Sequence, residues 1–444
     1  MRAFLYILVG FFTVPIFAQE IPSLDIQFQS TSRSAHSLLS EIDVLSVNNY
    51  VDSIITNGIK NKAFPGAQIL VAEKGNLIFH KAYGFHTYDS VQSVALDDIY
   101  DLASVTKIMG PLPALMKLVD EGKLDLDVPF STYWEPWRKR KDKKDITLRE
   151  ILSHQAGLRP YIVFLDKVLA KNGALKKRFI RKSKNDRFEN EAYEGLYVKN
   201  TFAKKMYRMI NRSKVSKDKK YVYSGLTFLI FPELIRQLTG VPYVKYIQDN
   251  FYIPIGSKTL GFLPKTKVFP NKIVPTEVDT IYRHTTTQGW VHDENASLLG
   301  GVSGNAGLFG TATDLAKMMQ LYLRYGKYGP DQIISENVVR EFIQVQYPDN
   351  ENRRGLGFDK PLLNNSELPL PEAYPAPEVS PQSFGHVGFT GTFVWADPKN
   401  QLVYIFLSNR VYPSRNHRKL YELHIRSAVQ QVFYTALSKT GQHP

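Results

Sequence analysis

The stretch Ala103-Ser104-Val105-Thr106-Lys107 is followed by a largely apolar segment, residues 108–119. A serine and a lysine three residues apart lie on one face of a helix, so the hydroxyl and the amine can share a pocket. An amine that has lost its proton can activate a serine hydroxyl as a nucleophile. A serine at a helix N-terminus also lies beside unpaired backbone N–H groups, which suit a developing oxyanion. The stretch therefore predicts a nucleophilic serine at the start of a buried helix.

A second pair with the same spacing, Ser216 and Lys219, shows that the spacing alone is weak evidence. With serine and lysine each at roughly 6–7% of residues, about two chance matches are expected in a chain this long. Ser216 lies in a run of charged residues with no apolar helix behind it. We therefore predict that Ser104 is the functional serine and that the pair at Ser216 is a chance match.

The N-terminus has the features of an export signal. A single basic residue, Arg2, precedes the apolar stretch 4–17, and Ala18 comes just before a polar segment. These features predict a secretory signal peptide over residues 1–18. A membrane anchor is the alternative, but the apolar stretch is short for a span. We expect residues 19–44 to form a loose leader.

The composition of the 444-residue chain, with 43% hydrophobic and 22% charged residues, is that of an ordinary globular protein. The chain has no cysteine, which excludes disulfide bonds and a thiol nucleophile. The spacing of its histidines matches no metal motif such as His-Glu-x-x-His, so neither a metal nor a cofactor is expected. Together with the signal peptide, this composition indicates a periplasmic or secreted bacterial protein.

The net charge of +14 is unevenly distributed along the chain. Between Asp166 and Lys220 there are 18 Lys/Arg and 6 Asp/Glu. The chain lacks the paired Cys/His fingers and aromatic strings of nucleic-acid-binding modules, so no nucleic-acid partner is expected. A solvated helical insertion over about residues 160–220 is the simpler interpretation. The alternative is an insertion that binds an anionic envelope polymer or a membrane surface.

The two ends of the chain contain strand patterns, and mostly helical patterns lie between them. Each end has two apolar runs that flank a short turn, which is typical of a β-hairpin. A helix is expected over 42–59 and another over about 420–437. The Gly-rich segment 300–310 lacks the Walker pattern, so phosphate binding is not expected there. The sequence thus predicts an α+β fold with one antiparallel sheet built from both chain ends. The expected strands are 67–72, 77–84, 391–396 and 402–407.

Three motifs stand in order along the chain: Ser104-Val105-Thr106-Lys107, Tyr223-Ser224-Gly225 and His386-Val387-Gly388. They resemble the three motifs of class C β-lactamases and related penicillin-recognising serine hydrolases. The resemblance covers about residues 45–440, as a single domain, and implies the β-lactamase-like fold. In that fold a sheet lobe, about 45–115 and 384–440, faces a mostly helical lobe, about 116–383, with the active site in the cleft between them.

The resemblance implies roles for the residues of the motifs. Ser104 would attack a carbonyl carbon to form an acyl-enzyme, and Lys107 would take the hydroxyl proton with Tyr223 as its partner. Tyr223 would then protonate the leaving atom; without this context it would be one of 25 tyrosines with no special role. The backbone N–H groups of Ser104 and Phe389 would form the oxyanion hole. His386, Gly388 and Phe389 would bind substrate.

Two positions depart from the family pattern. Gly225 stands where the second motif usually has an asparagine that binds the substrate amide, and His386 stands where the third motif usually has a lysine. A histidine titrates near neutrality and is a weaker fixed cation for a substrate carboxylate. Both departures argue against efficient penicillin hydrolysis, although related esterases and peptidases often carry His-x-Gly at this point.

The sequence therefore predicts an exported serine hydrolase that forms an acyl-enzyme on an ester or amide. The substrate classes that stay open are a β-lactam, a D-alanyl peptide and an ester. The alternative is a catalytically silent envelope-binding protein of the same fold, which would use its basic insertion to hold anionic polymers. The intact Ser104–Lys107 pair argues against that alternative.

Overall fold

The computed structural model describes residues 41–268 and 270–439, so the predicted signal peptide and most of the expected leader lie outside the described residues. Residues 41–44, the end of that leader, are helical instead. Its centre is a five-stranded antiparallel sheet in the order β13-β14-β15-β1-β2. Both chain ends contribute to this sheet, as the sequence predicts, and the two expected hairpins are present. The short strand β13, which carries the third motif, was not predicted. The strands are β1 (Gly66–Glu73), β2 (Asn76–Gly84), β13 (Phe384–Val387), β14 (Phe393–Asp397) and β15 (Leu402–Ser408).

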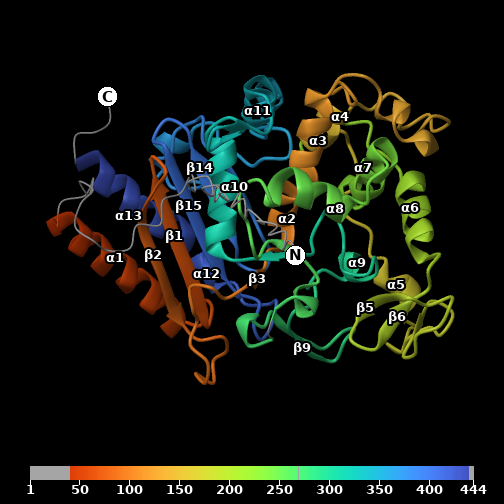
Figure 1. The fold of residues 1–444 in the computed structure, drawn as a ribbon, viewed down its shortest axis with the longest axis horizontal. Coiled ribbons are helices and arrows are strands. Elements are labelled where there is room, and N and C mark those ends of the chain that lie inside the picture. The colour runs from red at the N-terminus through yellow and green to blue at the C-terminus, as the bar shows by residue number, and fades with distance from the viewer. Residues whose placement is uncertain (1–40, 269, 440–444) are drawn as a thin grey trace, which may run out of the picture.

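Helices cover both faces of this sheet (Figure 1). α1 (Glu41–Lys60) and α13 (Ile425–Lys439) pack together on one face, and α10 (Ala312–Leu323) packs on the other. All eight residues of β1 are buried between them. Leu70 faces the α10 side and Ile69 the α1 side, which is the period-two alternation of a strand.

Most of the rest of the chain forms the helical lobe and its small sheets. Two helices do not: α12 (Lys419–Glu422) packs with α13, and α10 packs on the sheet. α10 comes from the 116–383 stretch that we expected in the helical lobe, yet it packs on the sheet. The remaining helices are α2 (Thr106–Met109), α3 (Pro111–Asp120), α4 (Leu148–Leu152), α5 (Leu165–Val168), α6 (Phe202–Arg212), α7 (Phe231–Thr239), α8 (Tyr243–Ile247), α9 (Glu294–Ser297), α11 (Glu336–Ile343) and α12 (Lys419–Glu422). The small strands are β3 (Tyr100–Asp101), β7 (Gly261–Phe262), β8 (Glu277–Asp279), β9 (Thr285–Thr287), β10 (Leu308–Gly310), β11 (Lys327–Tyr328) and β12 (Asp331–Gln332).

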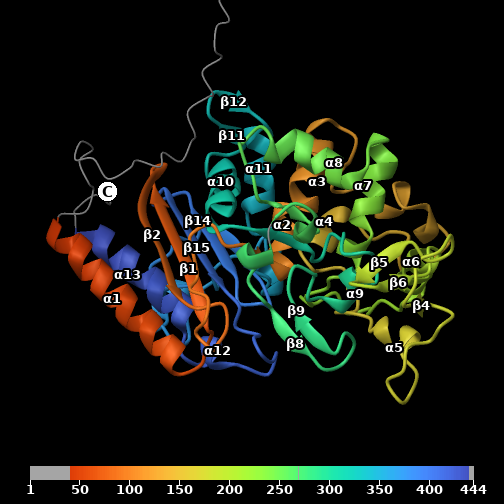
Figure 2. The same ribbon diagram turned by 60° about the horizontal axis from the view of Figure 1, so that its bottom comes forward.

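The basic insertion is not the helical segment that we expected. Besides α5 and α6 it contains a three-stranded antiparallel sheet in the order β4-β6-β5. Figure 2 shows the insertion at the end of the molecule farthest from α1. Its strands are too short to produce a clear alternating pattern in the sequence. They are β4 (Ile180–Arg181), β5 (Asn190–Tyr193) and β6 (Leu196–Val198).

Among residues 41–268 and 270–439, no helix combines the length and apolar character needed to cross a membrane.

The helix that follows Ser104 is interrupted between α2 and α3, and the residues at the junction explain the break. α2 ends at Met109 and is followed by Gly110, and α3 starts with Pro111 as its first residue, where the missing N–H of proline costs nothing. Ser104 lies just before α2, in the single turn η1 (Ala103–Val105).

Candidate active site

The turn that presents Ser104 follows directly after β3 and has an unusual backbone conformation. Ala103 has a φ of 45°, in the left-handed region that residues with a Cβ rarely adopt. The Asp101 carboxylate accepts a hydrogen bond from the Ala103 N–H at 2.8 Å and holds this conformation. Asp101 is buried, and burial raises the pKa of its carboxyl. Ser104 itself stays partly exposed at the surface.

Lys107 lies directly beside the serine. Its Nζ is 2.9 Å from the Ser104 Oγ and 3.1 Å from the backbone oxygen of Asn305. Only 2% of Lys107 is exposed. Both polar partners of the amine, a hydroxyl and a backbone carbonyl, are uncharged. The expected Ser–Lys pair is therefore formed.

The Asn305 carbonyl reaches Lys107 because the Gly-rich segment runs close to neighbouring backbone. A Cβ on Gly304 would lie 2.2 Å from the carbonyl oxygen of Phe228, so no larger residue fits there without a shift. The Asn305 side chain is fixed as well, since it accepts from Ser303 and donates to Asp293. Gly304 thus allows the close packing that places the Asn305 carbonyl beside the Lys107 amine.

Tyr223 joins the pair from the helical lobe. The centre of its ring is 5.3 Å from the Lys107 Nζ and 5.7 Å from the Arg354 guanidinium. The ring of His154 lies 4.5 Å from the Tyr223 ring, and that of His386 lies 6.2 Å away. Residues from four distant parts of the sequence therefore surround Tyr223, and the structure brings all three expected catalytic residues together.

Hydrogen bonds to the 154–160 segment hold the second motif in place. His154 Nδ1 accepts from the Ser224 N–H at 3.2 Å, while the Ser224 hydroxyl donates to the Arg159 carbonyl at 2.6 Å. A Cβ on Gly225 would lie 3.9 Å from the Cε of Lys107, so this position faces the lysine with room to spare. Because residue 225 is a glycine, it has no side-chain amide with which to bind a substrate amide, as an asparagine would.

His386 is buried and uncharged, so our expectation of a weak cation near neutrality is wrong. Its Nδ1 donates to the Val387 carbonyl at 2.7 Å, and only 2% of the residue is exposed. Burial, helped by the nearby charges of Arg354 and Lys107, lowers the pKa of His386 to about 3. The imidazole is neutral at any physiological pH. The third motif therefore offers no cation to a substrate carboxylate.

The loop after β13 is tied to the backbone on either side of the serine turn. The Thr390 hydroxyl donates to the Asp101 carbonyl at 2.7 Å, and the Thr392 hydroxyl donates to the Leu102 carbonyl at 3.1 Å. A Cβ on Gly388 would lie 2.6 Å from that Leu102 oxygen, so glycine is required for this close approach. In the described structure, the N–H groups of Ser104 and Phe389 donate to no protein acceptor, as an oxyanion hole requires.

Comparison with known proteins agrees with this geometry. A family model described as Beta-lactamase matches residues 51–427. The chain belongs to the β-lactamase family. Its relatives include a "Putative D-alanyl-D-alanine carboxypeptidase" of Salmonella enteritidis PT4, 29% identical over 90% of this chain and 89% of that protein. The protein of the same name in Salmonella heidelberg is 30% identical over 81% of this chain and 82% of the relative.

Solved structures of this β-lactamase-family fold resemble the chain over most of its length. The hydrolase EstCE1, described as having promiscuous acyltransferase activity, has a TM-score of 0.63 and 18% identity, covering 88% of this chain and all of that one. A class C β-lactamase from Rhodobacter sphaeroides has a TM-score of 0.58 and 16% identity, covering 86% and 99%. At these identities the likeness concerns the fold alone.

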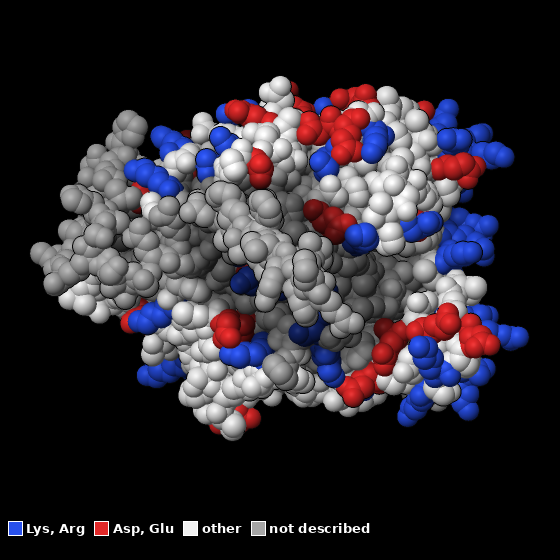
Figure 3. Space-filling view, in the orientation of Figure 1, with Lys and Arg blue, Asp and Glu red and all other residues white. Residues whose placement is uncertain are grey.

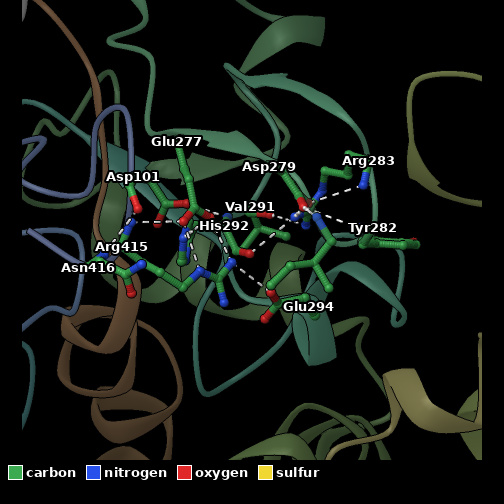
Figure 4. Close-up of polar contacts among 12 residues, drawn as sticks. Asp101, Glu277, Asp279, Tyr282, Arg283, Val291, His292, Glu294, Arg415 and Asn416 are labelled. Carbon is green, nitrogen blue, oxygen red and sulfur yellow. Dashed lines mark hydrogen bonds and ion pairs between the residues drawn. The ribbon is translucent and has the colours of Figure 1, made fainter. Parts of the chain in front are cut away.

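A charged network beside the loop after β13 was not predicted from the sequence of this β-lactamase-family protein (Figure 4). The ring of His292 stacks on the Phe389 ring, with 5.6 Å between the ring centres. The backbone N–H of His292 donates to the Asp101 carboxylate at 2.7 Å. His292 Nε2 and Arg415 both bind Glu277. Burial alone would raise the pKa of Glu277, but these two partners outweigh it and lower the pKa to about 2. The network links both sides of the expected oxyanion hole.

Other residues at the site were also missed, because only tertiary packing places them there. Arg354 pairs with the buried Asp359 and lies against Tyr223. Arg410 lies 4.4 Å from the Phe389 ring, whose residue is 48% exposed at the surface. No motif or spacing marks either arginine.

Among the described residues, no group of three or more His, Asp or Glu side chains is placed to hold a metal ion.

Proposed function

We propose that this member of the β-lactamase family is an exported serine hydrolase that forms an acyl-enzyme through Ser104. The observation that carries the proposal is the 2.9 Å contact between the Lys107 Nζ and the Ser104 Oγ. A nucleophile within hydrogen-bond reach of a base that is itself held by a third group is the usual arrangement for covalent catalysis. Here the third group is the Asn305 carbonyl.

In the proposed reaction the Ser104 oxygen bonds to the carbonyl carbon of an ester or amide while its proton passes to a neutral Lys107. The negative charge that develops on the carbonyl oxygen is stabilised by the N–H groups of Ser104 and Phe389. As the bond to the leaving group breaks, the leaving oxygen or nitrogen takes a proton from Tyr223, which Lys107 replenishes. Water then attacks the acyl-enzyme and releases the acid and free Ser104.

The state of His386 favours a substrate that needs no cation at the third motif. A neutral, buried imidazole gives a carboxylate little electrostatic stabilisation, whereas an uncharged ester makes no such demand. The Gly225 position adds no amide group to hold a peptide. We therefore propose an ester or simple amide as the preferred substrate class and expect β-lactams to react poorly.

A D-alanyl peptide is the second candidate, because the relatives from Salmonella carry the name D-alanyl-D-alanine carboxypeptidase. The predicted signal peptide would place the protein in the periplasm or outside the cell, where such peptides occur. A catalytically silent envelope-binding protein is the remaining alternative. These three proposals make different predictions for covalent labelling and for turnover.

The test incubates the purified protein with a fluorescent fluorophosphonate and, separately, with a fluorescent penicillin, and uses the Ser104→Ala variant as the control. The proposal expects strong phosphonate labelling, weak penicillin labelling and neither in the variant. Turnover of a p-nitrophenyl ester faster than release of D-alanine from a D-alanyl-D-alanine peptide supports the ester. The reverse order supports the carboxypeptidase, and absence of both labels from the native protein overturns the enzyme proposal.

A further inference from the structure

A basic groove runs along α6 on the insertion, outside the site around Ser104. It has a volume of about 980 Å³ and lies between α6 and the 159–178 segment. No acidic side chain lines it. Figure 3 shows Lys and Arg side chains gathered along this edge of the molecule. The basic residues of the groove are Arg159, Lys167, Arg178, Lys204, Lys205, Arg208 and Arg212.

The amphipathic character of α6 creates this face. Phe202, Met206 and Ile210, four residues apart, are buried in the core of the lobe. The basic residues therefore project from the other faces of the helix, where residues four apart are separated by about 6 Å along the axis. Lys204 and Arg208 form one such outward pair, so α6 presents a row of cations rather than a single one.

Within the described part of the chain, the groove cations have no carboxylate in ion-pair contact, and Glu233 acts on Lys204 only from a greater distance. None of its seven basic residues forms an ion pair there with a carboxylate, whereas Arg236 and Lys245 on nearby helices pair with Glu233 and Asp249. The groove cations also crowd one another. Partial burial and the charges of Arg178, Lys167, Lys176 and Arg208 lower the pKa of Lys205. A bound anion would relieve this repulsion.

An aromatic ring holds two of these cations in place before any ligand arrives. The Lys205 Nζ lies 4.1 Å from the centre of the Phe179 ring, and the Arg178 guanidinium lies 4.6 Å from it. Cation–π contacts of this kind fix side chains that would otherwise move freely in solvent. Such ordering lowers the entropy lost on binding. A charged face whose side chains only contact water would not require this ordering of Lys205 and Arg178.

The wall of the groove is also part of the second motif's support. Arg159 lines the groove, and its carbonyl accepts the hydrogen bond from the Ser224 hydroxyl at 2.6 Å. The next carbonyl, that of Pro160, accepts from the Gly225 N–H at 3.2 Å. A ligand in the groove would therefore lie next to the segment that positions Tyr223-Ser224-Gly225.

We propose that the basic groove binds a linear anionic polymer, one that carries phosphate or carboxylate groups at short intervals. A chain of repeated charges can contact the row of cations on α6 and the cations of the opposite wall together. A recessed groove suits an extended chain better than the flat surface of a lipid bilayer. This binding needs no chemistry at Ser104, so Ser104→Ala is expected to bind as the native protein does.

The test measures the binding of fluorescein-labelled inorganic polyphosphate and of poly-L-glutamate to the full-length protein by fluorescence anisotropy over a series of salt concentrations. Affinity should fall steeply with added salt, because each contact between the polymer and the groove releases counterions and because dissolved salt screens the charges. The variant Lys204→Gln/Lys205→Gln/Arg208→Gln should bind at least about tenfold more weakly, which corresponds to roughly 1.4 kcal/mol.

The matched control is Lys60→Gln/Lys62→Gln/Lys399→Gln, which removes the same charge from exposed positions of the sheet lobe. It should keep most of the affinity. Equal losses in the two variants, with unchanged circular dichroism, would reduce the effect to net charge and overturn the proposal. Binding to vesicles that contain anionic phospholipid, with none to either polymer, would also overturn it in favour of a membrane surface. Salt-insensitive binding would point to another surface.

Discussion

Two serine–lysine pairs with the same spacing lie in opposite environments. Lys107 is buried, and its amine contacts Ser104 and a backbone carbonyl. Lys219 is exposed and pairs with Glu150, while the Ser216 oxygen accepts from the Asp218 N–H at 3.2 Å. Burying an amine is costly unless polar partners compensate for the lost water. Burial against the serine and a carbonyl, rather than the spacing in the sequence, therefore distinguishes the first pair from the second.

The pairs also differ in what lies behind them. Ser104 is followed by α2 and α3, whose side chains fill the core of the helical lobe, and the loop after β13 closes over its turn. Ser216 is held by two hydrogen bonds in an exposed segment: its N–H donates to the Gly157 carbonyl at 2.8 Å, and its Oγ accepts from the Asp218 N–H. The first serine is fixed by packing on several sides, whereas the second is fixed by hydrogen bonds at the surface.

The largest effect is expected from removing the buried amine. Lys107→Ala should lower the rate of acylation by roughly 10²–10⁴-fold, the usual contribution of a positioned proton-transfer group. Lys219→Ala should leave that rate unchanged. The measurement is the rate constant for labelling with an excess of fluorophosphonate. Equal rates for native protein and Lys107→Ala would remove Lys107 from the mechanism.

A smaller loss is expected when Tyr223 loses only its hydroxyl. Tyr223→Phe keeps the ring between its aromatic neighbours but cannot transfer a proton, so acylation should slow by at least about tenfold. Tyr221→Phe is the matched control, because Tyr221 lies two residues away and also packs on His154. Stopped-flow hydrolysis of a p-nitrophenyl ester compares them, and a similar loss in both would indicate packing alone.

The burial of His386 should also affect stability. Because the pKa of His386 is lowered to about 3, the unfolded state binds a proton on His386 between that value and its ordinary value near 6.5, and the folded state does not. The free energy of unfolding should therefore fall as pH falls below about 6.5. From pH 7 to pH 5 the share of His386 is about 2 kcal/mol.

Urea denaturation of native protein and His386→Gln at the two pH values measures this share. The glutamine does not titrate, so the variant should lose about 2 kcal/mol less than native protein on acidification. His80, whose pKa is also lowered by burial, contributes alike to both proteins. An identical pH dependence in the two would mean that His386 is solvated in solution.

The smallest effect is expected at the exposed pair. Lys219→Ala removes a surface ion pair with Glu150, so the free energy of unfolding should change by at most about 1 kcal/mol. Thermal unfolding followed by circular dichroism is sufficient to detect a larger change. A larger loss would show that the second pair has a structural role that its exposure does not suggest.

Local signals in the sequence predicted much of the fold. The ends of some helices have residues that are typical of helix ends: Thr147 and Glu150 form a capping box at α4, and Gly240 ends α7 in the left-handed conformation. β13 was missed because four residues with glycine and histidine carry little strand signal. The strands of the insertion were missed for the same reason, since two to four residues cannot show a period.

At the site, the motifs predicted which residues lie together, but not their charges or their supporting contacts. Ser104, Lys107 and Tyr223 come together as expected. The neutral state of His386 depends on burial and on Arg354, which no spacing connects to it. His292 and its network likewise reach Phe389 only through the fold. Charge states and supporting contacts arise from tertiary packing, so the sequence pattern does not reveal them.

The most direct test of this account is to find the acyl group itself. Turnover of an ester substrate is stopped with acid, the protein is digested, and the peptides are analysed by mass spectrometry. We expect the added acyl mass on the peptide that contains Ser104, and none in the Ser104→Ala variant. An acyl group on Ser216, or continued turnover by Ser104→Ala, would contradict the claim that the buried pair is the catalytic one.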